Sequence, residues 1–377
     1  MISDMKQMNS EIYKVLEADS EYWVRNNFAY KNFISCVTFM ILLASCKVDP
    51  PFGNVDRHSH THYNLNVPAG LPTMIIPADN LLSVEGIALG RKLFYDKILS
   101  ANSTMSCASC HQFKNYFIDS AKQYSVGVDQ VQGTRNSMPL FNLGYAKSFF
   151  WDGSSPSLEA QVSGPITNPI EMHETMPNVI SKLQAHPEYP TLFKAAFGTD
   201  IVTSKLISQA IAQFERTLIS ANSKFDQWKR GEVAFTEQET RGLNVFLDLN
   251  KGDCTHCHSY GSTFTDFEFK NNGLDSVSMD KGRALVTKLI ADEGKFKTPT
   301  LRNIEMTAPY MHDGRFNTLR ECIDHYNTNF HYSANLAPEL RTMTKNRMTE
   351  QDIDDIIAFL KTLTDREFIT KTAFDKP

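Results

Sequence analysis

The sequence predicts a mainly α-helical protein made of two similar halves, and three observations support this fold class. Apolar residues recur at helical spacing from Ser204 to Leu218 and from Ile353 to Leu363. Few segments alternate apolar and polar residues in the manner of strands. A weak internal repeat is also present, because Gly90-Arg91-Lys92-Leu93-Phe94 and Gly242-Leu243-Asn244-Val245-Phe246 each precede one copy of the same cysteine motif. We therefore expect each half to begin with a helix that leads into that motif.

The N-terminal segment is typical of an export signal. Residues 33–44 are apolar and follow Arg25 and Lys31, and the run is too short to cross a bilayer comfortably as a helix. It ends in Leu-Ala-Ser-Cys46, which resembles the lipobox of bacterial lipoproteins, where the cysteine becomes acylated. We predict a signal peptide with a lipobox over residues 1–46 and a lipid anchor at Cys46. An ordinary signal peptide cleaved nearby, or a buried helix, is the alternative.

The next segment is expected to be a flexible tether. Residues 47–80 are rich in Pro, Asn, Gly and His and show no apolar periodicity. The remaining chain is long enough for two domains of ordinary size. We place the first domain at 81–225 and the second at 226–377, because the polar stretch 222–237 separates the two apolar patterns.

Two Cys-x-x-Cys-His pentads carry the strongest chemical signal in the chain. They are Cys107-Ala108-Ser109-Cys110-His111 and Cys254-Thr255-His256-Cys257-His258. Two thiols three positions apart can form thioether bonds to the vinyl groups of one porphyrin, and the following imidazole can coordinate its iron. The sequence thus predicts two cytochrome c-like domains, each with one covalent c-type haem, and His111 and His258 as iron ligands. A zinc site is the alternative, although zinc sites rarely end both cysteine pairs in His.

Charge and chemistry together indicate where the protein works. The formal net charge is −5, which is ordinary for 377 residues and argues against a general nucleic-acid binder. Covalent attachment of c-type haem takes place outside the cytoplasmic membrane in bacteria, in agreement with the predicted export signal. We therefore expect a periplasmic protein that is held at a membrane by its lipid anchor.

The stretch between the pentads resembles one known family. It contains Phe149-Phe150-Trp151-Asp152-Gly153, Leu158-Glu159-Ala160-Gln161 and Gly164-Pro165-Ile166-Thr167-Asn168-Pro169-Ile170-Glu171-Met172. These motifs closely resemble those of the bacterial diheme cytochrome c peroxidases, a family that includes the MauG-type enzymes, and the resemblance spans about residues 81–363. It implies that the first haem is the peroxide site, with Glu171 and Gln161 at its open face. It further implies that Pro165 shapes this pocket and that Trp151 lies between the two haems.

The chemistry expected of Glu171 also follows from the reaction itself. Cleavage of hydrogen peroxide needs a base that takes the proton from one oxygen and returns it to the leaving oxygen. The electrons would come from a small cytochrome c or cupredoxin, enter at the His258 haem and pass Trp151 on the way to the His111 haem. We therefore expect hydrogen peroxide and a small redox protein as partners.

Two departures from the typical peroxidases concern the distal faces of the haems. Peroxidases that need reductive activation carry a capping His in the loop after the first pentad, but no His occurs from Gln112 through Ser148. The resemblance therefore implies that the first haem is five-coordinate. The distal ligand of the second haem is Met in the typical peroxidases and Tyr in MauG, and Tyr326 stands at that position. The alternatives are Met306, Met311, His312 and His325.

The resemblance also implies a calcium ion, because the family binds Ca²⁺ between its domains through one Asn side chain and two backbone carbonyls. The matching positions are Asn136, Thr307 and Pro309. Few protein ligands and no carboxylate would make this a site of modest affinity. An Asn that only caps a turn is the alternative reading of Asn136.

Three functions are compatible with these observations. The first is an exported peroxidase that reduces hydrogen peroxide to two waters. The second is a MauG-like oxidase that oxidises residues of a partner protein, which Tyr326 and the missing capping His favour. The third is a diheme electron carrier without catalysis, which Glu171 argues against because a carrier needs no base at an open iron. A homodimer is left open.

Overall fold

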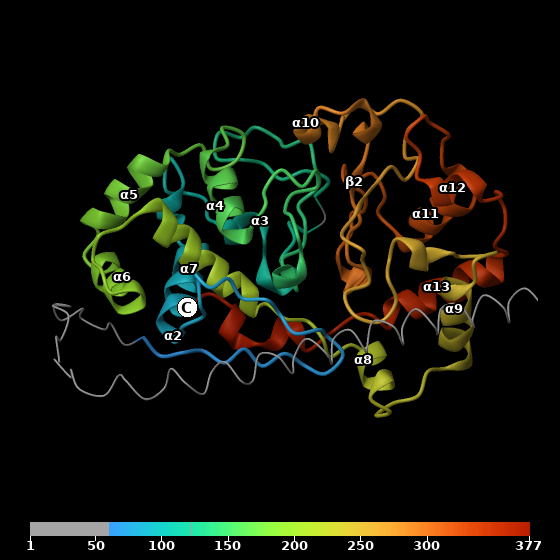
Figure 1. Ribbon diagram of the computed structural model, residues 1–377, viewed down its shortest axis with the longest axis horizontal. Helices are drawn as coiled ribbons and strands as arrows, with labels where there is room; N and C mark the ends of the chain where they lie inside the picture. The colour runs from blue at the N-terminus through green and yellow to red at the C-terminus, as the bar shows by residue number, and fades with distance from the viewer. Residues whose placement is uncertain (1–59, 121) are drawn as a thin grey trace, which may run out of the picture. The chain divides into compact units, whose positions relative to one another are not determined.

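The structure is a computed structural model that describes residues 60–120 and 122–377 (Figure 1). It is mainly helical, as predicted, and the only strands among these residues are the antiparallel pair β1 (Phe269–Lys270) and β2 (Phe296–Lys297). No helix in this part of the chain is long and apolar enough to cross a membrane. The predicted signal peptide, the lipid anchor at Cys46 and the beginning of the predicted tether lie outside the described residues.

Helices form most of both halves. Those of the first half are α2 (Val84–Tyr95), α3 (Cys107–Cys110), α4 (Leu158–Thr167), α5 (Met176–Ala185), α6 (Tyr189–Phe197) and α7 (Ser204–Thr217). Those of the second half are α8 (Lys224–Lys229), α9 (Glu237–Leu247), α10 (Ala284–Thr287), α11 (Leu319–Asp324), α12 (Pro338–Thr342) and α13 (Glu350–Lys361). Short segments include η3 (Leu143–Tyr145), η4 (Cys254–His256), η6 (Ile304–Met306), the π-helical η7 (His325–Asn329), η8 (Phe368–Thr370) and η9 (Thr372–Phe374). The helices predicted before each pentad, and at 204–218 and 353–363, are thus confirmed.

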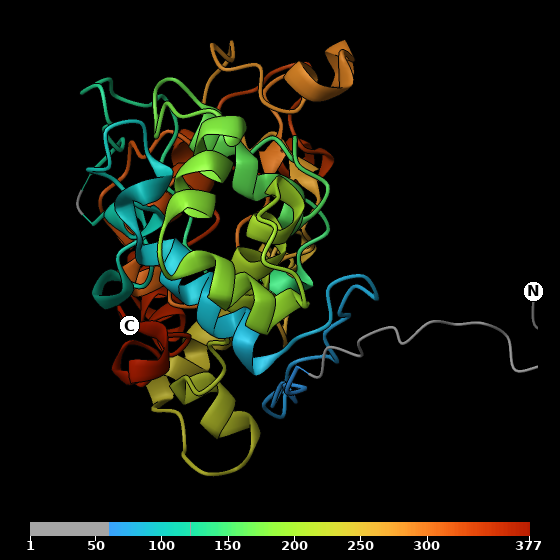
Figure 2. The same ribbon diagram turned by 90° about the vertical axis from the view of Figure 1, so that its left-hand side faces the viewer.

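The internal repeat is a repeated pair of packed helices. In the first half α2 packs along α7, and in the second α9 packs along α13 (Figures 1 and 2). Glycine lies at both crossings. A Cβ atom at Gly90 would lie 1.8 Å from the Ala210 carbonyl oxygen, and one at Gly242 would lie 1.9 Å from the Asp355 carbonyl oxygen. Only a residue without a side chain permits so close an approach of two helix backbones.

Each half has its own apolar core, but the chain end departs from the predicted second domain, 226–377. Phe368 and Phe374 pack in one aromatic cluster with Phe94 of α2. The Tyr95 hydroxyl donates a hydrogen bond of 2.6 Å to the Phe374 carbonyl. Figure 1 accordingly shows the C-terminus beside α2. Residues that follow the second half therefore complete the core of the first.

The prediction of a flexible tether up to residue 80 is wrong for its last part. Leu71 and Met74 are buried against Ile219 and Ala221, in the connection between the two halves. These apolar side chains are irregularly spaced and match neither a helix nor a strand, so periodicity alone could not reveal that they are buried.

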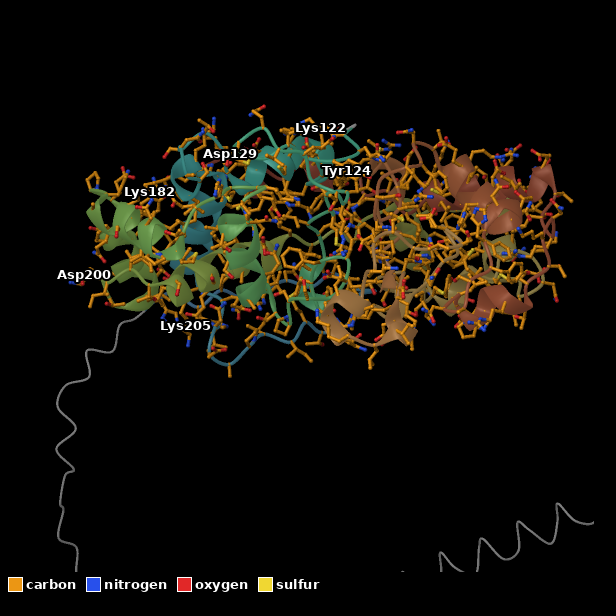
Figure 3. All side chains as sticks on the ribbon, turned by 90° about the horizontal axis from the view of Figure 1, so that it is seen from above. Lys122, Tyr124, Asp129, Lys182, Asp200 and Lys205 are labelled. Atoms are coloured by element: carbon orange, nitrogen blue, oxygen red, sulfur yellow. The ribbon has the colours of Figure 1, made fainter. Side chains whose placement is uncertain are left out.

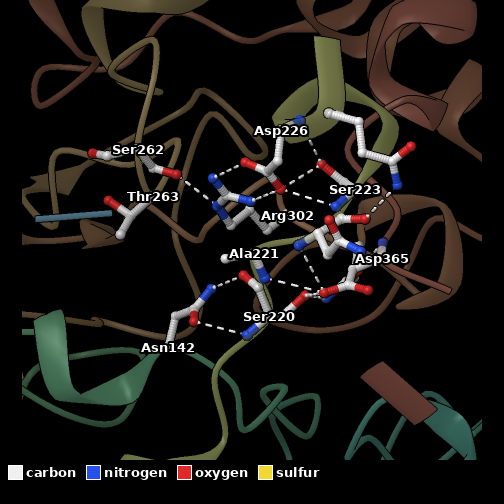
Figure 4. Close-up of polar contacts among 12 residues, drawn as sticks. Asn142, Ser220, Ala221, Ser223, Asp226, Ser262, Thr263, Arg302 and Asp365 are labelled. Atoms are coloured by element: carbon white, nitrogen blue, oxygen red, sulfur yellow. Dashed lines mark hydrogen bonds and ion pairs between the residues drawn. The ribbon is translucent and has the colours of Figure 1, made fainter. Parts of the chain in front are cut away.

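A buried polar junction holds the connection between the halves (Figure 4). Ser220 donates its backbone N–H to Asn142 Oδ1 at 3.0 Å, and its carbonyl accepts from Asn142 Nδ2 at 2.8 Å. Asn303, which occupies the equivalent left-handed turn of the second half, donates to Ser220 Oγ at 2.9 Å. The Asp365 carboxylate accepts from Ser220 Oγ and from the backbone N–H of Ala221. The connection is therefore bonded to both halves.

A buried ion pair completes this junction. Arg302 donates two hydrogen bonds to the Asp226 carboxylate, at 2.8 and 2.9 Å, and one at 2.5 Å to the Ser262 carbonyl. Arg302 is 1% exposed and Asp226 is 4% exposed. Asp226 also accepts from Ser223, the residue that caps the start of α8. The pair thus links α8 to the loop that runs through Arg302.

Candidate haem sites and active site

Both pentads place their histidines in the same way. His111 donates from Nδ1 to the Phe117 carbonyl at 3.0 Å, and His258 donates from Nδ1 to the Phe264 carbonyl at 3.2 Å. A carbonyl oxygen can only accept, so each ring carries its proton on Nδ1 and leaves Nε2 for a metal. The two phenylalanines have φ angles of 56° and 52°, which turn the chain back toward the ring.

The cysteines of the pentads fit a covalently bound porphyrin. Cys107 and Cys110 lie on the single turn α3, and Cys254 begins the turn η4. Cys107 and Cys254 pack against the aromatic clusters of their own halves. Within the described part of the chain, no three His, Cys, Asp or Glu side chains are placed to share a metal ion, so the zinc alternative is not assembled. Thiols on one turn beside a preset imidazole match c-type haem attachment.

Glu171 lies near the first pentad, and its role at the haem stays a prediction. It follows α4, and its Oε1 accepts a hydrogen bond of 2.7 Å from Asn168 Nδ2. Burial raises the pKa of the Glu171 carboxyl, and the bond from Asn168 only partly opposes this. The Glu171 charge in turn helps to raise the pKa values of the Cys107 and Cys110 thiols. The carboxyl group is therefore close enough to the first haem attachment site for its charge to be felt there.

Gln161 and Pro165 lie one turn apart on α4. Pro165 stands inside the helix and has no N–H, so the Gln161 carbonyl cannot have its usual helical partner. A Cβ atom at Gly164 would lie 2.8 Å from the Phe150 ring, which shows how closely α4 approaches the segment before Trp151. The Pro165 carbonyl accepts from the Met172 N–H at 3.1 Å and so ties the helix to the loop that carries Glu171.

Trp151 lies at the junction of the two halves. Its indole N–H donates to the Asn136 carbonyl at 2.9 Å, and its own carbonyl accepts from the Lys297 N–H of the second half at 2.8 Å. The side chain is 9% exposed. Lys297 donates from Nζ to the Ser148 carbonyl at 2.7 Å, and burial lowers its pKa to about 8. The first half therefore bonds the indole of Trp151, and the second half bonds its backbone carbonyl.

An ion network next to Trp151 was not identified from the sequence. Arg135 donates to Asp152 at 2.7 Å and to Asp280 of the second half at 2.7 and 2.9 Å. The sequence hinted at this network only because two of its members are next to predicted site residues: Arg135 precedes Asn136, and Asp152 follows Trp151. These three charged side chains join the two halves next to Trp151, the residue predicted to lie between the haems.

The loop that would carry a capping His packs on neighbouring segments. Lys122 and Tyr124 lie on this loop at the edge of the first half, together with Asp129 (Figure 3). Gln123 Nε2 donates to the Asp313 carbonyl of the second half at 3.0 Å. A Cβ atom at Gly127 would lie 2.1 Å from the Ile170 carbonyl oxygen, so the loop runs directly against the segment of Glu171.

Two of the proposed ligands of the second haem lie around one amide group. Tyr326, on η7, accepts a hydrogen bond of 3.3 Å at its hydroxyl from Asn272 Nδ2, and the Met311 sulfur lies 3.3 Å from the same nitrogen. His325 donates from Nε2 to the Asn272 carbonyl at 3.0 Å. Burial raises the pKa of Tyr326, and the thiols of Cys257 and Cys254 act in the same direction.

The remaining alternatives at this haem have other surroundings. His312 stacks on the Phe296 ring with centroids 3.6 Å apart, and Met306 is 37% exposed. Asn272 was not singled out from the sequence, because its importance depends on tertiary contacts that no local pattern encodes. Tyr326 and Met311 are therefore the two candidate ligands whose side chains both contact the Asn272 amide.

The predicted calcium ligands lie in ordered turns. Asn136 donates from Nδ2 to the Gln123 carbonyl at 3.1 Å and from its backbone N–H to the His312 carbonyl at 2.7 Å. Thr307 is buried and precedes the cis peptide bond between Ala308 and Pro309. Calcium at these positions stays a prediction.

A duplicated helical fold with one haem-attachment motif in each half defines the class as a c-type cytochrome with two haems. Residues 84–234 match the di-haem cytochrome c peroxidase family. The chain is 34% identical over 288 residues to the methylamine utilization protein MauG of Methylophilus methylotrophus, covering 76% of this chain and 84% of the relative. It is 36% identical over 305 residues to cytochrome c551 peroxidase of Nitrosomonas europaea, covering 78% and 85%. The chain belongs to the di-haem cytochrome c peroxidase family, which implies two c-type haems.

A solved structure supports the same assignment. The crystal structure of a MauG-like protein associated with microbial copper homeostasis superposes with a TM-score of 0.78 and 32% sequence identity, covering 84% of this chain and 99% of that chain. The relatives thus include proteins named as peroxidases and proteins named MauG.

Proposed function

We propose that this protein is a peroxidase that reduces hydrogen peroxide to two water molecules with electrons from a small cytochrome c or cupredoxin. The observation that carries this proposal is Glu171, a carboxyl group held by Asn168 beside the first haem attachment site. Haem iron, when bound at His111, supplies the metal centre and the electrons that peroxide reduction requires. A protein that only carries electrons needs no carboxyl group at this place.

Glu171 provides the proton transfer in this proposal. The ionised carboxylate accepts the proton of the oxygen nearer the metal and returns it to the outer oxygen, which leaves as water. Because burial raises the pKa of Glu171, proton return is easier than from an ordinary exposed glutamate. The Asn168 amide holds the carboxyl group by its hydrogen bond, and Gln161 on α4 is proposed as the second polar side chain of the peroxide site.

Trp151 is proposed as the electron bridge between the halves. Its indole N–H is bonded to the Asn136 carbonyl and its backbone carbonyl to the Lys297 N–H, so the residue is anchored to both halves at their junction. Electrons would enter through the second half, whose haem is attached near His258. We also propose a periplasmic location with a lipid anchor at Cys46, and a structural calcium ion at Asn136, Thr307 and Pro309.

The test is steady-state turnover of the holoprotein with hydrogen peroxide and a reduced small cytochrome. Glu171→Gln should lower kcat/KM by about 10²–10⁴-fold and remove the activity rise that accompanies ionisation of the wild-type carboxyl. The control Glu188→Gln makes the same change at an exposed carboxylate paired with Lys92 and should leave the rate unchanged. If Glu171→Gln retains most of the rate with a normal haem content, the proposal is wrong.

A MauG-like oxidase is the second candidate, and the presence of Tyr326, with its hydroxyl bonded by Asn272, favours it. A phenolate ligand would stabilise the ferric state of the second haem, as a strong oxidant of a partner protein requires. Low-temperature EPR of the oxidised protein should show a high-spin ferric signal beside a low-spin one if the first haem is open. Reaction of both haems with peroxide, without turnover of any small redox donor, would select this candidate over the peroxidase.

A further inference from the structure

Glu215 on α7 is a buried carboxyl group that the proposed reaction does not use. Its side chain is 4% exposed, and its Oε2 has no hydrogen-bond partner among the described residues. Burial raises the pKa of Glu215 to about 8, although the neighbouring Arg216 opposes this. A buried carboxyl group without a partner for its charge is kept neutral in this way.

The repeat shows that the fold does not need an acid at this position. The runs Phe214-Glu215-Arg216-Thr217-Leu218 and Phe359-Leu360-Lys361-Thr362-Leu363 end the equivalent helices α7 and α13. In each run the threonine hydroxyl donates to the phenylalanine carbonyl, at 2.7 Å in the first and 2.6 Å in the second. The final leucine carbonyl of each run accepts from the repeated asparagine, Asn142 or Asn303. The second half thus buries leucine where the first half buries glutamic acid.

The carboxyl group lies beside the first haem attachment site. After burial itself, the charge on Glu215 is the largest influence that raises the pKa of the Cys107 thiol. Cys107 packs against the aromatic cluster that contains Phe214, the residue before Glu215. A charge that appears on a group attached at Cys107 is therefore felt by Glu215 through protein of low polarity, where electrostatic interactions are strong.

The other charged side chains near Glu215 are bonded to other groups. Arg216 donates to the Glu159 carboxylate of α4 at 2.7 and 3.0 Å. On α2, which packs along α7, Arg91 donates to the Asp375 carbonyl at 2.6 Å and Lys92 pairs with Glu188. None of these contacts neutralises the carboxyl group of Glu215. Gain or loss of its proton is therefore the charge change available near the first haem attachment site.

We propose that Glu215 is a redox-linked proton site of the first haem. Glu215 holds its proton while the iron is ferrous and releases it to solvent when the iron becomes ferric by giving one electron to an external acceptor. One positive charge appears and one positive charge leaves, so the net charge of the interior stays constant. Ionised Glu215 stabilises the ferric state, and the potential of the first haem therefore falls as pH rises.

The test measures the potential of each haem in the full holoprotein by spectroelectrochemical titration from about pH 6 to 9. The potential of the first haem should fall as pH rises, with a slope that corresponds to at most one proton released for each electron removed. The second haem, whose equivalent residue is Leu360, should show a smaller pH dependence of its potential. Glu215→Gln keeps the shape of the side chain, and Glu215→Leu installs the residue of the second half. Both variants should lose most of the pH dependence of the first haem while its haem attachment and absorption spectrum are retained.

A pH dependence of the first haem that survives in Glu215→Gln would overturn the proposal, as would a wild-type potential that does not change with pH. Neither result bears on the peroxidase assignment, because the potentials are measured without peroxide. Loss of turnover in Glu171→Gln together with an unchanged pH dependence of the first haem would show that the two proposals concern separate groups.

Discussion

Replacement of Arg302 by Met should destabilise the junction between the halves. Arg302 and Asp226 are 1% and 4% exposed, and two hydrogen bonds of 2.8 and 2.9 Å join them. Arg302→Met leaves the Asp226 charge buried with only the bonds from Ser223. Breaking a buried pair from one side costs about 3–5 kcal/mol, because the remaining charge is uncompensated. We expect a loss of this size in the free energy of unfolding of the holoprotein, measured with urea at neutral pH.

The pH dependence of this loss provides an independent check. Burial alone would raise the pKa of Asp226, but the bonds from Arg302 and Ser223 outweigh it and hold the pKa below its usual value. A depressed folded-state pKa stabilises the protein above the unfolded pKa of about 4, and this contribution is lost as pH falls through the folded value. The difference between wild type and Arg302→Met should therefore shrink in acid.

The double variant Arg302→Met with Asp226→Leu decides whether the reasoning holds. It removes both charges and fills the space with apolar atoms, so it should recover most of the stability lost in the single variant. A single variant that costs less than about 1 kcal/mol, or a double variant as unstable as the single one, would refute the assignment of this pair as a buried ionic junction.

Two further predictions concern packing and the second haem. Gly90→Ala should destabilise the protein by about 1–3 kcal/mol or more, because its Cβ would lie 1.8 Å from a backbone oxygen, whereas Gly133→Ala, with no atom nearer than 3.5 Å, should have a small effect in the same thermal unfolding assay. Asn272→Leu removes the donor to Tyr326 and should shift the potential and the low-spin EPR signal of the second haem, with haem content unchanged. Tyr326→Phe is the reference variant. If the low-spin EPR signal of the second haem is unaltered in Tyr326→Phe, Tyr326 is not the ligand. If the signal changes in Tyr326→Phe but not in Asn272→Leu, only the role of Asn272 is ruled out.

Local patterns were sufficient for the features that depend on neighbouring residues. The pentads, the helices at their N-terminal side and the helical stripe of α7 are all encoded within short segments, and the structure reproduces each. The motifs that contain Trp151 and Glu171 likewise pointed to one residue at the junction and one residue near Cys107. The roles of these residues in catalysis stay predictions.

Features that depend on distant contacts could not be found in this way. Leu71 and Met74 have no periodicity, and their burial depends on Ile219 and Ala221, far along the chain. Asn272 reads as one polar residue in a polar loop until the fold brings Tyr326 and Met311 to it. These failures share a cause, because a single sequence records side-chain chemistry but not which loops meet in space.

The packing of Phe368 and Phe374 against the aromatic cluster of α2 bears on how the molecule is made. A ribosome produces the Cys107 segment long before these two phenylalanines, so the first half passes through synthesis with part of its core uncovered. Phe113 and Phe117, which follow His111 in the chain, belong to the same cluster and would remain accessible during that time. The porphyrin must reach both thiols of the first pentad to form its thioether bonds, and the late arrival of residues 368–374 would keep that site open. The last aromatic residues would then close the site after the porphyrin is in place.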